Sequence, residues 1–487
     1  MVISGLYLLV SICLVIYSIN SIYLLILYHR SKGSNPDTPD ITEWPSVTVQ
    51  LPVFNELNAV ERLINTVARL DYPSTHLQIQ ILDDSDDHTT ALISQVVSRL
   101  CEDGVNISHI HRETRSGYKA GALANGMTQA TGDFFAIFDA DFLPPPDFLK
   151  KSIPHFSDQN VGCIQCRWGH NNRDFSLLTK LQAMAIDAHF IVEQTARSRN
   201  GILLNFNGSG GVWRKTCIED SGGWQSGTLT EDFDLSYRAQ LQGWSIAYLP
   251  NLVVPGELPV QIDAYKNQQS RWARGSMQTA RKLLIPLLRS ELPLRLKVMG
   301  AIHLTHYMVH PLILLSLILS LFFHFEMSGV VRWLPLLMVT MLISPLLYLT
   351  CPAPEAPGWA RRLILVPPLM LMSVGISLNN ASAALIGLFG RNEGVFIRTP
   401  KFALLNNAGS WEKSHYVMRE RKWVVTWELI IALVVLIFLF QAIFSNNIYL
   451  IPWLIFYGFG YGLIAFYSIS QRGRCNEASM KKLLGSE

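Results

Sequence analysis

Long apolar runs at both ends of the chain enclose one polar stretch. Residues 2–28 contain no charged side chain, and at about 1.5 Å of rise per residue a helix of this length spans a bilayer. No basic region or small-residue cleavage site marks this run as a signal peptide. Residues 33–260 are polar and rich in Asp and Glu. Further spanning helices are predicted over residues 300–325, 331–351, 424–444 and 448–469.

Basic residues predict the orientation of these helices. Arg30 and Lys32 follow the first run directly, and Lys and Arg concentrate on the cytosolic side of membrane helices, so we expect the polar stretch in the cytosol. Residues 363–389 are apolar but contain two adjacent prolines and two adjacent asparagines. If they spanned fully, loop 390–423, with seven Lys or Arg against three Glu, would be external. The pattern therefore predicts a multi-pass protein of the cell membrane with five spans and one re-entrant or interfacial segment.

Short β-rich runs alternate with amphipathic helices in the polar stretch. Apolar residues at helical spacing predict helices over residues 59–70 and 90–101, and small residues predict another over 119–130. This alternation predicts a parallel, doubly wound α/β sheet, in which ligands bind beyond the carboxyl ends of the strands. The chain has no G-x-G-x-x-G fingerprint and no Walker A loop, which argues against dinucleotide oxidoreductases and ATPases. The predicted strands are 47–51, 78–82, 105–110 and 134–138.

Charge and cysteine content narrow the functional classes. Only 16% of the residues are charged and 49% are hydrophobic, whereas a soluble protein averages about 25% charged residues. A net charge of +3 over 487 residues gives no basic field that would suggest nucleic acid as a partner. Cys163 and Cys166 form a lone C-x-x-C, so we expect reduced, mostly buried thiols rather than a zinc site or a disulfide framework.

Acidic residues follow two of the predicted strands directly. Asp139 and Asp141 follow the fourth strand, where two carboxylates one residue apart can hold Mg²⁺ or Mn²⁺ and thereby a diphosphate. A solvated turn is the structural alternative. Asp83 and Asp84 follow the second strand, and they either contact the base or ribose of a nucleotide or form a capping turn before the next helix.

Two further motifs suit group transfer. Lys119 opens a helix, where it either meets a phosphate near the helix N-terminus or is an ordinary surface lysine. Thr230-Glu231-Asp232 precedes a helix expected from about residue 233. A carboxylate there could remove the proton of an acceptor hydroxyl, and Thr230 could cap the helix. Capping and catalysis are compatible.

A basic amphipathic helix is predicted over residues 262–289 and would lie on an anionic membrane surface. It carries Gln268, Arg271 and Trp272. The guanidinium of Arg271 can bind a diphosphate through two donors, and the indole of Trp272 can stack on a sugar ring. The alternative is a pair of interfacial anchors, because Arg and Trp are common at membrane surfaces.

In this order, and followed by a membrane region, these motifs resemble the D, D-x-D, T-E-D and Q-x-x-R-W pattern of processive family-2 glycosyltransferases of the cellulose-synthase-like group. The resemblance covers about residues 45–285. Residues 205–214, 257–259 and 264–272 are similar to those of plant glucomannan and xyloglucan-backbone synthases in particular. Phe396-Ile-Arg-Thr399-Pro-Lys401 resembles the F-x-x-T gating loop of cellulose synthases.

The resemblance implies a GT-A (Rossmann-like) cytosolic domain inserted between transmembrane helices, inversion at the anomeric carbon, and a channel for the glycan. It also implies a role for each motif residue. Asp83 and Asp84 would contact the nucleoside, and Asp139 and Asp141 would bind the metal. The diphosphate would be held by Asp139, Lys119, Gln268 and Arg271, and the acceptor by Trp272. Asp232, beside Glu231, would be the general base, and Phe396 and Thr399 would belong to the gating loop.

The expected reaction is transfer of a hexose from UDP-glucose or GDP-mannose to a growing β-linked polysaccharide. The chain could form a homo-oligomer or work with a secretion partner. Two alternative functions stay open: a glycolipid-forming enzyme similar to ceramide glucosyltransferases, and a non-catalytic membrane scaffold. The expected organisation is an N-terminal anchor over residues 1–29, a cytosolic GT-A domain over 30–260, amphipathic interface helices over 261–298, a membrane channel region over 299–470 that includes the cytosolic loop 390–423, and a cytosolic tail over 471–487.

Overall fold

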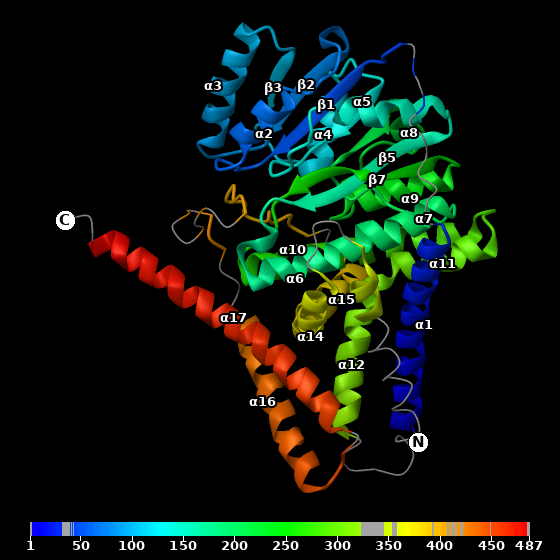
Figure 1. The fold of residues 1–487 in the computed structure, drawn as a ribbon, viewed down its shortest axis with the longest axis vertical. Coiled ribbons are helices and arrows are strands. Elements are labelled where there is room, and N and C mark those ends of the chain that lie inside the picture. The colour runs from blue at the N-terminus through cyan, green and yellow to red at the C-terminus, as the bar shows by residue number, and fades with distance from the viewer. Residues whose placement is uncertain are drawn as a thin grey trace.

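A sheet-containing domain and a group of long helices that extend away from it make up the molecule (Figure 1). The computed structural model describes residues 2–31, 39, 41, 43–322, 345–352, 358–391, 394–406, 409, 411, 414, 416–418, 422–448 and 450–484, with the backbone alone at 422 and 473–484. Lys32, most of the predicted span 331–351 and parts of loop 390–423 lie outside the described residues.

Within the described residues, seven strands form one mixed sheet in the order β3-β2-β1-β4-β6-β5-β7. The four predicted strands are present, and β3, β2, β1 and β4 run parallel, as expected. β6 runs antiparallel to both β4 and β5, while β5 and β7 pair in parallel. Six strands of this sheet therefore share one direction, and the expectation of a wholly parallel sheet fails at β6. β5, β6 and β7 are not among the predicted strands; unlike the equally short but wholly apolar β4, β6 contains a glycine and an arginine and gives no clear strand pattern. The strands are β1 Val47–Val53, β2 Leu77–Asp83, β3 Ile107–His111, β4 Phe134–Ile137, β5 Val161–His170, β6 Gly211–Arg214 and β7 Ser245–Gly256.

Helices cover both faces of the sheet. One hydrophobic core joins the sheet to α2, α3 and α5, and a second joins its other face to α4, α8 and α9. Parallel strands buried on both faces need such cover because their side chains are apolar on both sides. The helices are α2 Val60–Val67, α3 Thr89–Glu102, α4 Tyr118–Met127, α5 Phe148–Ser152, α8 Lys215–Asp220 and α9 Glu231–Leu241.

A long amphipathic helix, α10 (Ile262–Arg289), lies between the sheet domain and the membrane-type helices (Figure 1). Its bounds match the predicted 262–289. Ala273, Met277 and Ala280 on α10 pack in one core with Phe233 and Tyr237 of α9. α6 (Leu177–Asp187) and α7 (Thr195–Arg199), joined by the π-helical segment Ala188–Gln194, also run along this boundary.

Several apolar helices could cross a membrane. Among the described residues, three helices are long and apolar enough to do so: α1 (Val2–Arg30), Trp423–Phe444 within α16 (Lys422–Phe444), and Ile451–Arg472 within α17 (Ile451–Leu484). Two bent pairs also qualify if each is one span. The first pair is α11 (Leu294–Leu304) and the helical segment His306–Phe322, which contains α12 (Val309–Phe322); the angle between them is 53°. The second pair is α14 (Trp359–Gly375) and α15 (Ser377–Phe389), and its angle is 46°. The second bend falls in the segment predicted to be re-entrant or interfacial.

Candidate active site

A cavity of about 170 Å³ opens beyond the carboxyl ends of β1, β2 and β4. This is the edge of the sheet at which an α/β fold binds its ligands. The cavity brings together residues from α4, α9, α10 and the loop after α15. Of the predicted site residues, it is lined by Asp84, Lys119, Asp139, Asp141, Glu231, Asp232, Gln268, Arg271, Trp272, Phe396 and Thr399.

Asp139 comes directly after β4 and is paired with Lys119, the second residue of α4. Nζ of Lys119 lies 2.5 Å from Oδ1 of Asp139 and donates to the main-chain carbonyl of Gly208 at 2.7 Å. Burial lowers the pKa of Lys119, but Asp139 and Glu231 raise it more, so the pKa lies above its ordinary value. Lys119 is therefore a fixed positive charge in the wall of the cavity, not a surface lysine.

Asp141 is buried and satisfied by hydrogen bonds. Its Oδ2 accepts from the main-chain N–H of Glu257 at 2.8 Å and from Nζ of Lys401 at 2.9 Å. The carboxylate of Glu257 in turn accepts the main-chain N–H groups of Phe402 and Leu404. The acidic turn after β4 is thus tied to the segment after α15.

The carboxylates around this turn fit a hard divalent cation, because Mg²⁺ and Mn²⁺ prefer oxygen ligands. Glu56, just beyond β1, adds a third carboxylate to the wall. Oε1 of Glu56 lies 3.1 Å from Nη1 of Arg398, whereas its buried Oε2 has no hydrogen-bond partner among the described residues. Burial outweighs Arg398 and raises the pKa of Glu56 to about 8. A cation bound here would offset the free-energy cost of burying these carboxylates in their ionised form.

Glu231 and Asp232 form the first turn of α9 and face the same cavity. Burial, followed by the charge of Glu231, raises the pKa of Asp232 to about 7. Burial likewise raises the pKa of Glu231. A carboxyl group that titrates near neutral pH is suited to accept a proton during a reaction.

Thr230 occupies the N-cap position of α9 but makes no capping hydrogen bond with its side chain, so the predicted Thr cap is wrong. Its hydroxyl lies 3.3 Å from that of Thr279 on α10. A Cβ atom on Gly275 would come within 2.6 Å of the Thr230 side chain. The close approach of α9 to α10 therefore turns this hydroxyl away from the helix end.

α10 presents its three motif residues to the cavity. The guanidinium of Arg271 lies 4.7 Å from the centre of the Phe396 ring. Its buried Nε has no hydrogen-bond partner among the described residues, so it is available to a ligand in the cavity. Gln268 and the half-buried Trp272 line the same wall.

The segment 394–406, here called the loop segment, covers the cavity. The guanidinium of Arg398 also lies over the Tyr416 ring, at 4.1 Å, and Asn267 of α10 donates to the carbonyl of Ile397 at 3.1 Å. Thr399 is buried in the wall. The predicted Phe396 and Thr399 therefore both line the cavity, with Phe396 beside Arg271.

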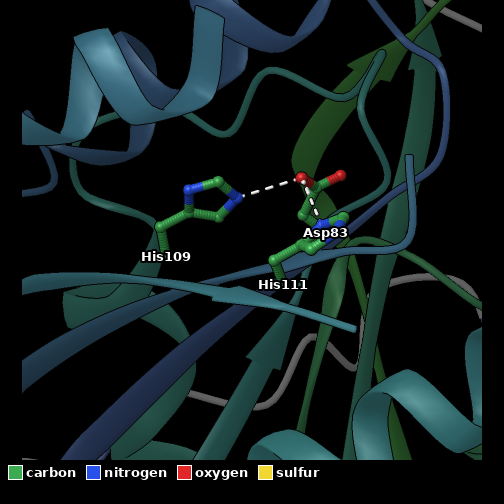
Figure 2. Close-up of side chains that lie close together, drawn as sticks. All are labelled: Asp83, His109 and His111. Atoms are coloured by element: carbon green, nitrogen blue, oxygen red, sulfur yellow. Dashed lines mark hydrogen bonds and ion pairs between the residues drawn. The ribbon is translucent and has the colours of Figure 1, made fainter. Parts of the chain in front are cut away.

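Asp83 differs from its neighbour, because it is fully buried and is not among the residues that line the cavity. Its Oδ2 lies 3.0 Å from Nε2 of His109 and 3.2 Å from Nδ1 of His111, both on β3 (Figure 2). Burial raises the pKa of Asp83, but hydrogen bonds from His109 and Ser85 lower it more, so the pKa lies well below its ordinary value. The ligand atoms lie within 4.8 Å of one another, and this Asp–His–His group could hold a metal ion.

Asp84 is the member of the acidic pair that lines the cavity. Arg112 holds it through two hydrogen bonds, from Nε at 2.7 Å and from Nη2 at 2.6 Å. Since the guanidinium fixes both carboxylate oxygens, the orientation of Asp84 is set before any ligand binds.

Sequence reasoning missed five residues of this region. His109 and His111 alternate along β3 and could have been noted as one face of a strand, but their meeting with Asp83 depends on the register of β3 against β2. Glu56 follows a strand end, which was the available signal. The contacts of Glu257 and Lys401 depend on how the loop segment packs, and no local pattern reveals them.

The sequence of the sheet domain is similar to that of known proteins. Residues 45–275 match the sequence model of the family described as glycosyltransferase like family 2. The chain is 40% identical over 275 residues to glucomannan 4-beta-mannosyltransferase 1 of Oryza sativa subsp. japonica, covering 54% of this chain and 52% of the relative. It is 41% identical over 255 residues to glucomannan 4-beta-mannosyltransferase 2 of Arabidopsis thaliana, covering 51% and 48%. The chain thus matches about half the length of these relatives.

The fold also has a solved counterpart. The mannosyltransferase PcManGT from Pyrobaculum calidifontis, in complex with GDP-Man and Mn²⁺, superposes with a TM-score of 0.53 at 20% identity, covering 79% of this chain and 100% of that one. At this identity the likeness concerns the fold alone. It confirms the predicted GT-A-type arrangement of a sheet flanked by helices.

Proposed function

We propose that the chain extends a β-linked polysaccharide by inverting transfer of a hexose from a nucleotide-sugar, because residues 45–275 match the family model described as glycosyltransferase like family 2. The observation that carries this proposal is the convergence of Asp139, Asp232 and Arg271 on one cavity. These residues come from three different elements. Together they can bind a diphosphate and accept a proton from an acceptor hydroxyl. We propose GDP-mannose as the donor, since both curated relatives are mannosyltransferases, with UDP-glucose as the alternative.

Positive groups would hold the donor. Lys119 and Arg271, whose Nε is unsatisfied among the described residues, both line the cavity, and Gln268 stands about one turn before Arg271 on α10. Asp84, fixed by Arg112, is placed to contact the nucleoside, with Asp83 behind it. Asp139 and Asp141 would hold Mg²⁺ or Mn²⁺, which offsets the charge of the departing diphosphate when bound.

Asp232 would accept the proton of the acceptor hydroxyl. Its pKa of about 7 leaves a large fraction ionised at neutral pH, and the proton gained would be retained better than by an ordinary carboxylate. Attack from the face opposite the diphosphate inverts the anomeric carbon. Trp272, on the same helix as Arg271, would lie against the terminal sugar of the acceptor and aim its hydroxyl.

A donor screen tests this function. Purified full-length protein, kept in detergent, is incubated with GDP-mannose or UDP-glucose and Mn²⁺, and release of GDP or UDP is measured. We expect release from GDP-mannose above that from UDP-glucose. A preference for UDP-glucose would replace the donor but keep the reaction. The absence of release from either donor, in protein that binds them, would leave a non-catalytic scaffold as the better interpretation.

We further propose that the sheet domain lies in the cytosol and that the apolar helices carry the glycan across the bilayer. The basic residues that flank α1 and the loop before α16 support this orientation. Two cysteines provide the test: the exposed native Cys101 on α3 and a new cysteine at Leu405, whose side chain is exposed in the loop segment. An impermeant thiol reagent should label both only after the membrane is opened. Labelling of Leu405→Cys in intact cells would contradict the topology.

A further inference from the structure

A second cavity, of about 220 Å³, lies where the sheet domain meets the membrane-type helices. One wall comes from α6 and the turn before it, and the other from the start of α14 and from residues 345–351. The two walls also share a hydrophobic core. The lining residues are Arg173, Asp174, Lys180, Met184, Asp187, Tyr348, Cys351, Arg361, Arg362, Ile364 and Leu365.

The lining is positively charged. Four basic side chains face two acidic ones, and each acid is paired with one of the bases. Asp187 lies 2.7 Å from Arg173 and 3.0 Å from His170, while Lys180 lies 3.6 Å from Asp174. Arg361 is exposed and makes no ion pair with its side chain among the described residues. Arginine in such a place favours phosphate, because its planar guanidinium offers parallel donors.

The surface of α14 beside this cavity is apolar, and Ile364 is both part of that surface and part of the lining. Trp359, Leu363 and Ile364 on α14 are 75%, 53% and 73% exposed, and they stand within one turn of Arg361. Exposed Trp and aliphatic side chains next to arginines are typical of the boundary between hydrocarbon and headgroups. Since α14 with α15 is also a candidate span, these side chains are placed to enter the bilayer while the basic residues stay at its surface.

We propose that this cavity binds the phosphate headgroup of an anionic phospholipid from the leaflet that faces the sheet domain. Arg361, Arg362 and Lys180 hold the phosphate, and the acyl chains leave along Leu363 and Ile364. A free phosphate would satisfy the basic groups but would leave the exposed apolar side chains of α14 beside them in contact with water, which is why the lipid is the favoured source. The bound lipid fixes α14 against α6 and thereby the sheet domain against the membrane. This site is independent of the proposed transferase reaction.

Binding of short-chain lipids tests the proposal. Full-length protein is freed of lipid in a neutral detergent and titrated by calorimetry with dihexanoyl-phosphatidylglycerol, dihexanoyl-phosphatidylcholine or inorganic phosphate. We expect phosphatidylglycerol to bind at least about tenfold more tightly than either of the others, because charge-assisted hydrogen bonds and apolar contact act together. Equal binding of the two lipids, or binding of inorganic phosphate as tight as that of phosphatidylglycerol, would overturn it.

Substitutions locate the binding. Arg361→Gln with Lys180→Gln should weaken phosphatidylglycerol binding at least about tenfold. Arg173 and Asp187 are left unchanged, since Arg173 pairs with Asp187 and Asp187 is bonded to His170 in the wall of the active-site cavity. The matched control is Arg289→Gln, which removes an exposed positive charge at the end of α10, outside the cavity. The proposal is overturned if the control weakens binding as much as the double variant, or if the double variant, folded by its thermal transition, binds like the wild type.

Discussion

Lys401 and Asp141 meet across the active-site cavity, with Nζ of the lysine 2.9 Å from Oδ2 of the carboxylate. Lys401 also donates to the main-chain carbonyl of Glu257 at 2.6 Å. The two residues are 260 positions apart in the chain, so the loop segment reaches the acidic turn after β4 only in the folded protein. Asp141 therefore combines two functions: it anchors the loop segment and supplies one of the carboxylates proposed to bind a divalent cation.

Activity should depend on a divalent cation and on Asp141. Asp141→Asn removes a negative ligand and the partner of Lys401 while keeping the side-chain size. We expect turnover to fall at least about 100-fold, the scale found when a main electrostatic contributor is removed, and Mn²⁺ binding measured by electron paramagnetic resonance to weaken. Excess chelator should abolish wild-type activity. Full activity in chelator would refute the metal assignment.

Asp232→Asn should abolish transfer and spare donor binding, since the amide keeps the shape but cannot accept the proton. The exposed Asp220→Asn, at the end of α8, is the matched control and should behave like the wild type. Nucleotide release and donor affinity are measured on the same preparation. Product formation by Asp232→Asn at a near-normal rate would place the base elsewhere, with Glu231 the next candidate.

The pH profile should report the same residue. The ionised form of Asp232 is the active base, and burial beside Glu231 raises its pKa to about 7. Activity should therefore be full above this value and be lost as the pH falls through it, by about tenfold for each unit well below the pKa. The measurement is kcat/KM for the donor against pH at fixed Mn²⁺, with donor-analogue binding as the control. A flat profile down to about pH 5 would contradict the assignment.

Trp272→Ala should impair the acceptor step more than donor binding. Stacking on an aromatic ring contributes on the order of 1–3 kcal/mol, which corresponds to roughly 10- to 100-fold in rate at about 1.4 kcal/mol per decade. Trp272→Phe should recover part of the loss because it restores an aromatic face. If Trp272 were only a membrane anchor, turnover per folded molecule would stay normal while the yield and thermal stability fell.

The sequence predicts the features that are local and misses those that depend on distant packing. Asp139 and Asp141 were identified because they follow a buried strand, and α10 was bounded correctly because its 28 residues keep one amphipathic pattern. β5, β6 and β7 were not predicted. β5 contains Gln, Arg and His, β7 contains two prolines, and β6 contains a glycine and an arginine, whereas the equally short β4 is wholly apolar. The pairing of Asp83 with His109 and His111 depends on strand register, and the contact of Lys401 with Asp141 depends on the docking of a segment that follows the membrane-type helices.

Analysis of the product tests the central claim most directly. The full-length protein, reconstituted in lipid vesicles with GDP-mannose and Mn²⁺, should release GDP and form a long glycan that a β-mannan-specific hydrolase digests. Asp232→Asn in the same vesicles should form none. A product limited to a single sugar on lipid would contradict polysaccharide synthesis and favour a glycolipid-forming enzyme. If the protein binds the donor but neither releases GDP nor forms glycan, the transferase function itself is contradicted.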